Sequence, residues 1–130
     1  MVTKVPPSII EKVGFEFDWS NRKVWALDVP IEEMSISKLS WHFGISFWNT
    51  RGGCYDLTPN QVILSPKKWT KEYQRILKAD LRHPIDIMFN KRRWLILDGL
   101  HRLVKAKIKG KKKVRVRKIP LFMIPLIRIE

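Results

Sequence analysis

Residues 84–110 read PIDIMFNKRRWLILDGLHRLVKAKIKG and contain the clearest structural signals of the chain. Within it, residues 85–97 form two apolar runs with a polar turn between them, which predicts a β-hairpin. Asp98 is placed to N-cap a helix over 99–109, whose apolar residues recur at helical spacing, and Gly110 is a natural terminator. The second strand of the hairpin therefore runs directly into a helix.

The next segment, residues 113–119, reads KVRVRKI and predicts a further strand. Val114 and Val116 alternate with Arg115 and Arg117, so the apolar and basic side chains should lie on opposite faces. Hairpin, helix and strand together predict an α+β fold with a small mixed β-sheet and packed helices. At roughly 100 to 200 residues per domain, the 130 residues predict one domain over 1–130.

Weaker signals on the N-terminal side predict further elements. The pattern favours an edge strand over 14–19, a buried strand over 23–29 that Pro30 ends, and a short helix over 36–44. Arg51 to Cys54 predict a loop.

Two Ser or Thr residues each precede a proline, which is typical of a helix N-cap. These pairs are Thr58-Pro59 and Ser65-Pro66, so each predicts a helix start. In the second helix, the spacing predicts one apolar stripe, formed by Trp69, Tyr73, Ile76 and Leu77. At the end of the chain, LFMIPLIRIE at 121–130 is nearly all apolar, and Pro125 argues against a central strand or a helix there. This tail is expected to close the core or to form an interface, for example of a homodimer.

Basic residues are concentrated in one half of the chain. Residues 67–118 hold nineteen Lys and Arg against four Asp and Glu, whereas residues 1–66 hold six against seven. The whole chain has a formal charge of +14 at pH 7. A solvated face or a thermophile's lysine enrichment can also produce such a run, but thermophile ion-pair networks need matching acids. The imbalance favours an anionic partner, nucleic acid before membrane.

The expected contacts to a nucleic-acid backbone form two clusters. They are Lys91, Arg92 and Arg93 in the hairpin turn, and Lys111, Lys112, Lys113, Arg115 and Arg117 around the last strand. An exposed Trp94 beside the first cluster would suit base stacking, and Trp48 is a second candidate, whereas the other tryptophans are expected to fill the core.

Several classes of protein and site are disfavoured. The single cysteine, Cys54, excludes an intramolecular disulfide framework and a zinc site built on several thiolates. No apolar run approaches the roughly 18 to 20 residues of a membrane span, and the N-terminus lacks the apolar core of a signal peptide. A cytoplasmic protein without a membrane partner is expected.

The string Leu97-Asp98-Gly99-Leu100-His101-Arg102 is the best candidate for chemistry. A helix N-terminus offers unpaired backbone N–H groups and a positive dipole end, which attract phosphate. Gly99 lets an anion approach the backbone, and His101 and Arg102 add charged donors. Asp98 can cap the helix or hold a Mg²⁺ ion that bridges phosphates. The alternative is purely structural, with a capping Asp98 and solvent-facing His101 and Arg102.

ILDGLHRLVKA, preceded by DLRHPIDI and followed by GKKKVRVRKIP, resembles the core of the ParB/sulfiredoxin superfamily. KVWALDVPIEEM resembles its first strand and turn more loosely. The resemblance implies a phosphate-binding or nucleotide-binding module, with a nucleoside di- or triphosphate and Mg²⁺ as ligands. It places Gly99, Leu100, His101 and Arg102 at the phosphates, and His83 is a further candidate for lining the pocket.

Departures from the family narrow its activities. Leu100 stands where sulfiredoxin carries its reactive cysteine, so reductase chemistry is not expected. The Asp-Gly-x-His-Arg form is closer to the branch with ADP-dependent free-serine kinases. That branch implies an alternative function, a small phosphotransferase acting on a metabolite hydroxyl, with Glu32 or Glu33 as the base. Members are also called nuclease-like, but the sequence offers no pair of water-activating carboxylates. His42, between Trp41 and Phe43, is expected to be a satisfied core histidine.

Overall fold

A mixed four-stranded sheet with strand order β1-β4-β2-β3 forms the framework of the protein. The computed structural model describes residues 8–15 and 17–129. The strands are β1 (Ile31–Ser35), β2 (Ile85–Asn90), β3 (Arg93–Asp98) and β4 (Lys113–Lys118). The β1–β4 and β2–β3 pairs are antiparallel, and β2 runs parallel to β4. The predicted α+β fold with a small mixed sheet is confirmed.

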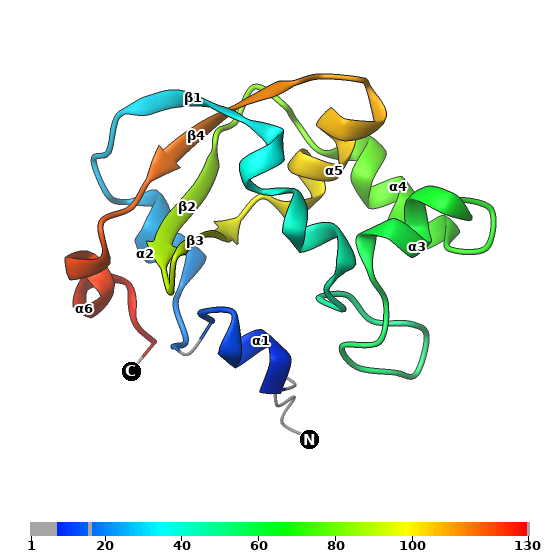
Figure 1. Cartoon of the computed structure of the whole chain (residues 1–130), viewed down its shortest axis with the longest axis horizontal. Helices are drawn as coiled ribbons and strands as arrows, with labels where there is room; N and C mark the ends of the chain where they lie inside the picture. The colour runs from blue at the N-terminus through cyan, green and yellow to red at the C-terminus, as the bar shows by residue number, and fades with distance from the viewer. Residues whose placement is uncertain (1–7, 16, 130) are drawn as a thin grey trace.

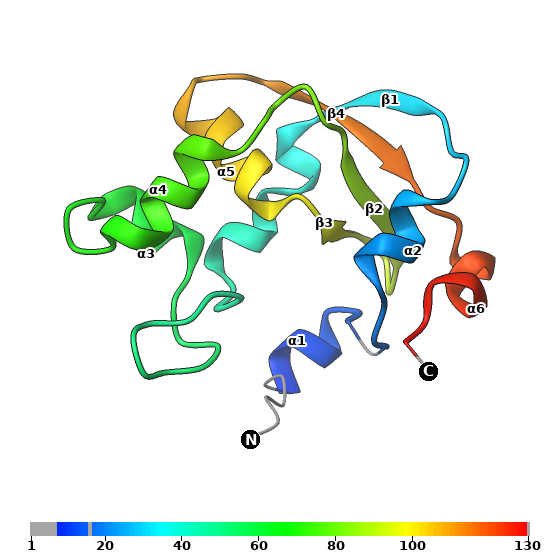
Figure 2. The ribbon, with the colours of Figure 1, turned by 180° about the vertical axis from the view of Figure 1, so that it is seen from behind.

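Helices cover both ends of this sheet, and helix α1 (Ser8–Lys12) lies apart from them (Figure 1, Figure 2). The other helices are α2 (Asn21–Trp25), α3 (Pro59–Leu64), α4 (Thr70–Lys78), α5 (Leu100–Ile108) and α6 (Ile124–Ile127), with 3₁₀ helices η1 (Ile36–Lys38), η2 (Ser40–Gly44) and η3 (Leu121–Met123). Figure 1 shows α3, α4 and α5 together at one end and α2 and α6 at the other, and Figure 2 shows the same arrangement from behind. Among the described residues, no helix is both long and apolar enough to cross a membrane.

The hairpin, the following helix and the last strand are confirmed close to their predicted bounds. Lys91 and Arg92 form the two-residue turn with φ of 48° and 67°, the left-handed region that type I′ hairpin turns require. Gly110 follows the helix at φ 74°, and the amide of Lys111 donates to the carbonyl of Ala106 at 3.0 Å. This bond and that of Gly110 to Lys107 form a Schellman motif, which satisfies carbonyls left open at the helix end.

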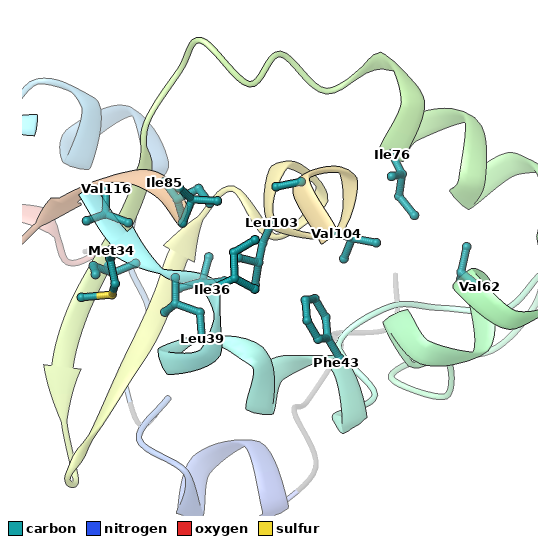
Figure 3. Packing of buried hydrophobic residues seen from close by; sticks show 14 of the residues in the cluster. Met34, Ile36, Leu39, Phe43, Val62, Ile76, Ile85, Leu103, Val104 and Val116 are labelled. Carbon is teal, nitrogen blue, oxygen red and sulfur yellow. The ribbon is translucent and has the colours of Figure 1, made fainter. Parts of the chain in front are cut away.

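Helix α5 supplies the middle of the main core. Leu103 and Val104 are fully buried and point toward the 3₁₀ helices, where Leu39 and Phe43 lie (Figure 3). Ile76 of α4 covers the same cluster from the other side of α5. The core therefore fixes α5 between the sheet and α4, and so fixes the place of its N-terminus.

Two predicted N-terminal strands are wrong. Residues 23–29 contain the end of α2 and a turn, because the Ser20 side chain accepts the N–H of Lys23 and caps a helix there. Residues 14–19, apart from Glu16, which lies outside the described residues, form a turn and a bend with one isolated bridge, Trp19 to Arg128. The strand of this region is β1, further along the chain.

Smaller predictions had mixed outcomes. The helix over 36–44 is two 3₁₀ helices. Thr58 caps α3 as predicted, and the structure adds a capping box with Gln61. Ser65 begins a turn, and α4 starts at Thr70.

Leu77 is 42% exposed and does not belong to the apolar stripe of α4. Trp48 is 7% exposed and Trp94 is half-buried, so neither is an open stacking platform. Trp25 was expected in the core, but it is 57% exposed at the end of α2.

The C-terminal tail closes a second core cluster. Pro125 lies in the first turn of α6, where its missing N–H costs no hydrogen bond, so the expectation that it excludes a helix is wrong. Ile127 is fully buried with Val24, Met88 and Ile119. The same tail leaves Phe122 78% exposed.

Candidate functional site

The junction between β3 and α5 requires a glycine at position 99. Its φ of +114° is outside the range that L-residues readily adopt, and a Cβ there would lie 3.2 Å from side-chain carbons of Ile85. The first bond of α5 joins the amide of Leu103 to the carbonyl of Gly99 at 3.0 Å. The amides of residues 100–102 precede that bond and have no intrahelical acceptor. These N–H groups are the donors that the sequence predicted for an anion.

Asp98 does not cap α5, contrary to the prediction. Gly99 occupies the N-cap position, and without a side chain it makes no side-chain cap. Asp98 is still the last residue of β3, where its Oδ2 accepts the indole N–H of Trp25 at 2.7 Å and lies 3.7 Å from Nη1 of Arg102. Its carboxylate thus joins α2 to the first turn of α5.

Arg102 ties the junction to the segment before β2. Its Nη1 donates to the carbonyl of Pro84 at 2.9 Å, and its side chain is 21% exposed. One guanidinium can donate five hydrogen bonds, so this contact leaves donors of Arg102 for a ligand.

His101 is held from two sides. Its Nε2 donates to Oε1 of Glu72 at 2.5 Å, and its ring stacks on Trp48 with centroids 4.6 Å apart and planes 17° apart. Glu72 is buried on α4, and its other oxygen lies 3.6 Å from Nη1 of Arg75. The sequence analysis missed Glu72, because a glutamate in a basic helix resembles a solvent-facing residue. The only signal is its position next to Tyr73 and one turn before Ile76 on the inner side of α4.

Two cavities, each of about 400 Å³, meet at this junction, and both are lined by Asp98, Gly99 and His101. The first, which we name the aromatic cavity, has walls formed by Leu100 and by the rings of Phe15, Phe17, Trp19, Phe47, Trp48 and Tyr55. The second, which we name the basic hollow, is also lined by Arg75, Lys78, His83 and Arg102. The structure thus brings the predicted residues 98–102 and His83 together.

His83 stands on a tight turn before β2. Its amide donates to the carbonyl of Asp80, and its imidazole Nε2 lies 3.8 Å from Oδ2 of Asp80. The Asp80 carboxylate accepts the side chain and the backbone N–H of Arg82, which holds the pKa of Asp80 well below its usual range. This turn fixes the backbone of His83 at the rim of the basic hollow, with its side chain 68% exposed.

Glu32 and Glu33 lie far from the junction. They are in β1, one edge of the sheet, and β4 and β2 separate them from Asp98 in β3. At about 4.8 Å per strand, the separation is roughly 14 Å across the sheet. Glu32 pairs with Lys118 at 3.3 Å. The structure therefore does not bring the predicted bases to the predicted phosphate site.

The protein offers few ligands for a Mg²⁺ ion at Asp98. Asp86 lies opposite Asp98 on the neighbouring strand, but its buried Oδ1 has no hydrogen-bond partner among the described residues and lies 3.3 Å from Nη1 of Arg117. With Arg102 beside Asp98, guanidinium groups occupy the space next to both carboxylates. Within residues 8–15 and 17–129, no group of three or more His, Cys, Asp or Glu side chains could hold a metal ion.

The residues predicted to contact nucleic acid separate into two regions. Lys111, Lys113 and Arg115 line a depression with His83 and Arg102, so this region continues the basic hollow. The turn residues Lys91, Arg92 and Arg93 lie at the other end of β3, about 17 Å from Asp98 at 3.3 Å per residue.

Arg117 does not belong to this surface. Its side chain is 11% exposed, it pairs with Asp86, and it donates to the carbonyls of Leu27 and Val24 at 2.6 and 3.3 Å. The alternation of strand β4 predicted an outward side chain, but α2 and the turn after it cover that position.

In comparisons with known proteins, no family model, no curated protein and no solved structure matches this chain.

Proposed function

We propose that the protein binds the phosphate groups of a nucleotide or nucleic acid at the N-terminal end of α5. The observation that carries this proposal is the meeting of the basic hollow and the aromatic cavity at Asp98, Gly99 and His101. Three cationic side chains and free helix amides suit phosphate, and aromatic walls suit a base. A nucleotide carries a phosphate and a base side by side, which matches the adjacent basic hollow and aromatic cavity.

A nucleic-acid strand would continue along Lys111, Lys113 and Arg115, which extend the basic hollow. These side chains neutralise backbone phosphates, and counterion release then favours binding at low salt. The resemblance to the ParB/sulfiredoxin superfamily points to the same ligand class and stays a prediction. Transfer of a phosphoryl group with Glu32 or Glu33 as base is not part of this proposal, because of the separation across the sheet.

Mg²⁺ enters the proposal only as an ion carried by the ligand's own phosphates, with Asp98 as a single protein ligand. A thermal-shift series of nucleoside di- and triphosphates, with and without Mg²⁺, tests this point. A bound nucleotide should raise the Tm of the native chain, and Arg102→Ala should abolish that rise. An equal rise in both proteins would place the ligand elsewhere.

Fluorescence anisotropy with a short labelled single strand tests the contact to nucleic acid. The affinity should fall steeply with salt, by about 0.7 in log K per neutralised phosphate and log unit of salt for a single strand. Lys78→Ala should weaken binding and reduce the slope by about one. Lys38→Ala, at an exposed site at the end of η1, is the matched control and should change neither. The proposal fails if both variants behave alike.

Self-association through the C-terminal tail is a separate part of the proposal. Leu121, Phe122, Leu126 and Ile129 are 47%, 78%, 61% and 60% exposed within nine residues. Clustered apolar side chains of this kind are typical of an interaction surface. The partner that the proposal names is a second copy of the chain.

A further inference from the structure

Two histidines from separate elements line the basic hollow. His101 comes from the first turn of α5, and His83 from the tight turn before β2. A carboxylate stands behind each imidazole, Glu72 at 2.5 Å from His101 and Asp80 at 3.8 Å from His83. His101 belongs to the helix N-terminus that the sequence predicted, whereas His83 is a second, separate group brought to it by the fold.

The two imidazoles differ in their surroundings, and this difference gives them different roles. Glu72 is buried and fixes Nε2 of His101 as the proton donor to the carboxylate, so Nδ1 is the ring nitrogen left to accept a proton. The ring stack on Trp48 holds that orientation. His83 is 68% exposed at the rim, where a leaving group can reach it and where water can reprotonate it.

The cations of the hollow complete the arrangement. Arg102, Lys78 and Arg75 line the same space as the two imidazoles. Positive groups fixed around a phosphate stabilise the negative charge that grows on its oxygens in a phosphorane transition state. A general base, a general acid and fixed cations are the groups needed to cleave a phosphodiester whose nucleophile is already attached to the substrate.

We propose that this hollow cleaves RNA by internal transesterification, with His101 as general base and His83 as general acid. His101 Nδ1 takes the proton of the ribose 2′-hydroxyl, and the 2′-oxygen forms a bond to the adjacent phosphorus. The bond from phosphorus to the 5′-oxygen of the next nucleotide breaks, and protonated His83 gives its proton to that oxygen. The products are a 2′,3′-cyclic phosphate and a 5′-hydroxyl end, and the step needs no metal ion.

The aromatic cavity fits the base of the nucleotide that carries the attacking hydroxyl. His101 lies between this cavity and the basic hollow, so a base stacked within the aromatic rings would bring its own ribose to the imidazole. The inference rests on the proposed binding of nucleic acid, and it goes further in naming RNA as the substrate and a reaction at the site.

The test uses the full chain with a labelled RNA oligonucleotide in EDTA, and with the same oligonucleotide carrying 2′-deoxyribose throughout. The native chain should cut the RNA to ends with a cyclic phosphate and should bind the deoxy strand without cutting it. His83→Ala, at a side chain that is 68% exposed, should lower the rate by about 10²-fold or more. His101→Asn should lower it at least as much, and Lys38→Ala, purified in the same way, should leave it unchanged.

Glu72→Gln separates a positioning role from a structural one. The pH profile should pass through a maximum, because one imidazole must be neutral and the other charged. The charged groups near His101 are Glu72, Arg75 and Lys78 of α4 with Asp98 and Arg102 at the junction. Those that line the same hollows as His83 are Lys78, Asp80, Arg82, Asp86, Asp98, Arg102, Lys111, Lys113, Arg115 and Arg117. Glu72→Gln should lower kcat with little change in KM, because Glu72 orients His101 without touching the RNA, while thermal unfolding shows a folded protein.

Three outcomes overturn the inference in distinguishable ways. If the native chain binds the RNA with the predicted salt dependence but cleaves nothing, the proposed function stands and the cleavage is wrong. If the chain binds neither strand, both are wrong. Cleavage that survives in His83→Ala and His101→Asn at the native rate also rejects the assignment of these two residues.

Discussion

His42 and Ile96 are joined by a buried hydrogen bond, in which the imidazole Nε2 accepts the backbone N–H of Ile96 at 3.0 Å. Nδ1 of the same ring donates to the carbonyl of Leu39 at 2.7 Å. Both nitrogens are therefore satisfied by a neutral ring, which confirms the prediction of a satisfied core histidine. Burial lowers the pKa of His42 from 6.5 to about 4.

The stability of the protein should fall between pH 7 and pH 5 because of His42. The folded state resists protonation, so the unfolded state binds the proton first as the pH falls below 6.5. The free energy of unfolding should decrease by about 2 kcal/mol from pH 7 to pH 5. Urea unfolding at both pH values measures this change.

His42→Gln is the control, because it removes the titrating imidazole and leaves all the other titratable groups of the protein in place. The variant should be less stable at pH 7, yet the difference between it and the native chain should shrink by that amount at pH 5. A constant difference would show that His42 does not carry the dependence.

The hairpin turn stores strain that one substitution can remove. Arg92 has a φ of 67°, and an L-residue in the left-handed region costs roughly 1–2 kcal/mol. Arg92→Gly removes this cost but adds roughly 0.5–1 kcal/mol of backbone entropy loss. We therefore expect a net stabilisation of about 0.5 kcal/mol in the free energy of unfolding.

The neighbouring substitution should have the opposite sign. Arg93 begins β3, where glycine weakens a strand, and its guanidinium lies 5.0 Å from the centroid of the Trp41 ring. Arg93→Gly should thus destabilise by about 1 kcal/mol. If both variants lose stability equally, the turn carries no strain at Arg92.

The parts of the fold that sequence predicted correctly are those with local determinants. The hairpin, Gly110 as the end of α5 and Thr58 as the cap of α3 all depend on residues within one turn or strand. The predicted strand over 23–29 is wrong because its local pattern is ambiguous. Its apolar spacing fits a strand or a buried helix end, and the Ser20 cap and the burial of Val24 against Ile127 and Met88 favour the helix.

The exposed tail should make the protein self-associate in a concentration-dependent way. Phe122→Glu places a charge at the most exposed apolar residue of the tail and should shift the population to monomer in analytical ultracentrifugation. Leu64→Glu at the end of α3 is the matched control, since Leu64 is 81% exposed outside the tail. A native chain that is monomeric at all concentrations contradicts the dimer.

Within the candidate site, the sequence predicted the residues that are neighbours in the chain and, from the segment before β2, His83. Gly99, His101 and Arg102 lie in one helical turn, so their proximity follows from local structure. Glu72 comes from 29 positions earlier and meets His101 only because α4 packs on α5. Side-chain partners of this kind depend on the packing of whole elements, which spacing along a sequence does not contain.

Arg117 should contribute to stability, whereas Arg115, on the same strand, should contribute to binding. Arg117→Leu leaves the carboxylate of Asp86 buried without its countercharge and should destabilise by roughly 3–5 kcal/mol. Arg115→Leu, at an exposed position on the same strand, should change stability by no more than about 0.5 kcal/mol and should instead weaken binding to nucleic acid. Urea unfolding and anisotropy of the two variants measure the contrast.

The pH dependence of Arg117→Leu identifies Asp86 as the cause. Burial raises the pKa of Asp86, and Arg117 lowers it in part, so the variant should raise this pKa further. An acid whose folded pKa is raised becomes neutral in the folded state as the pH falls, and its unfavourable charge then disappears. The destabilisation should therefore be smaller at pH 4.5 than at pH 7, and Asp86→Asn in the same chain should recover most of it at pH 7. An undiminished loss at low pH, or no recovery in the double variant, would assign the effect to lost packing of the arginine against α2.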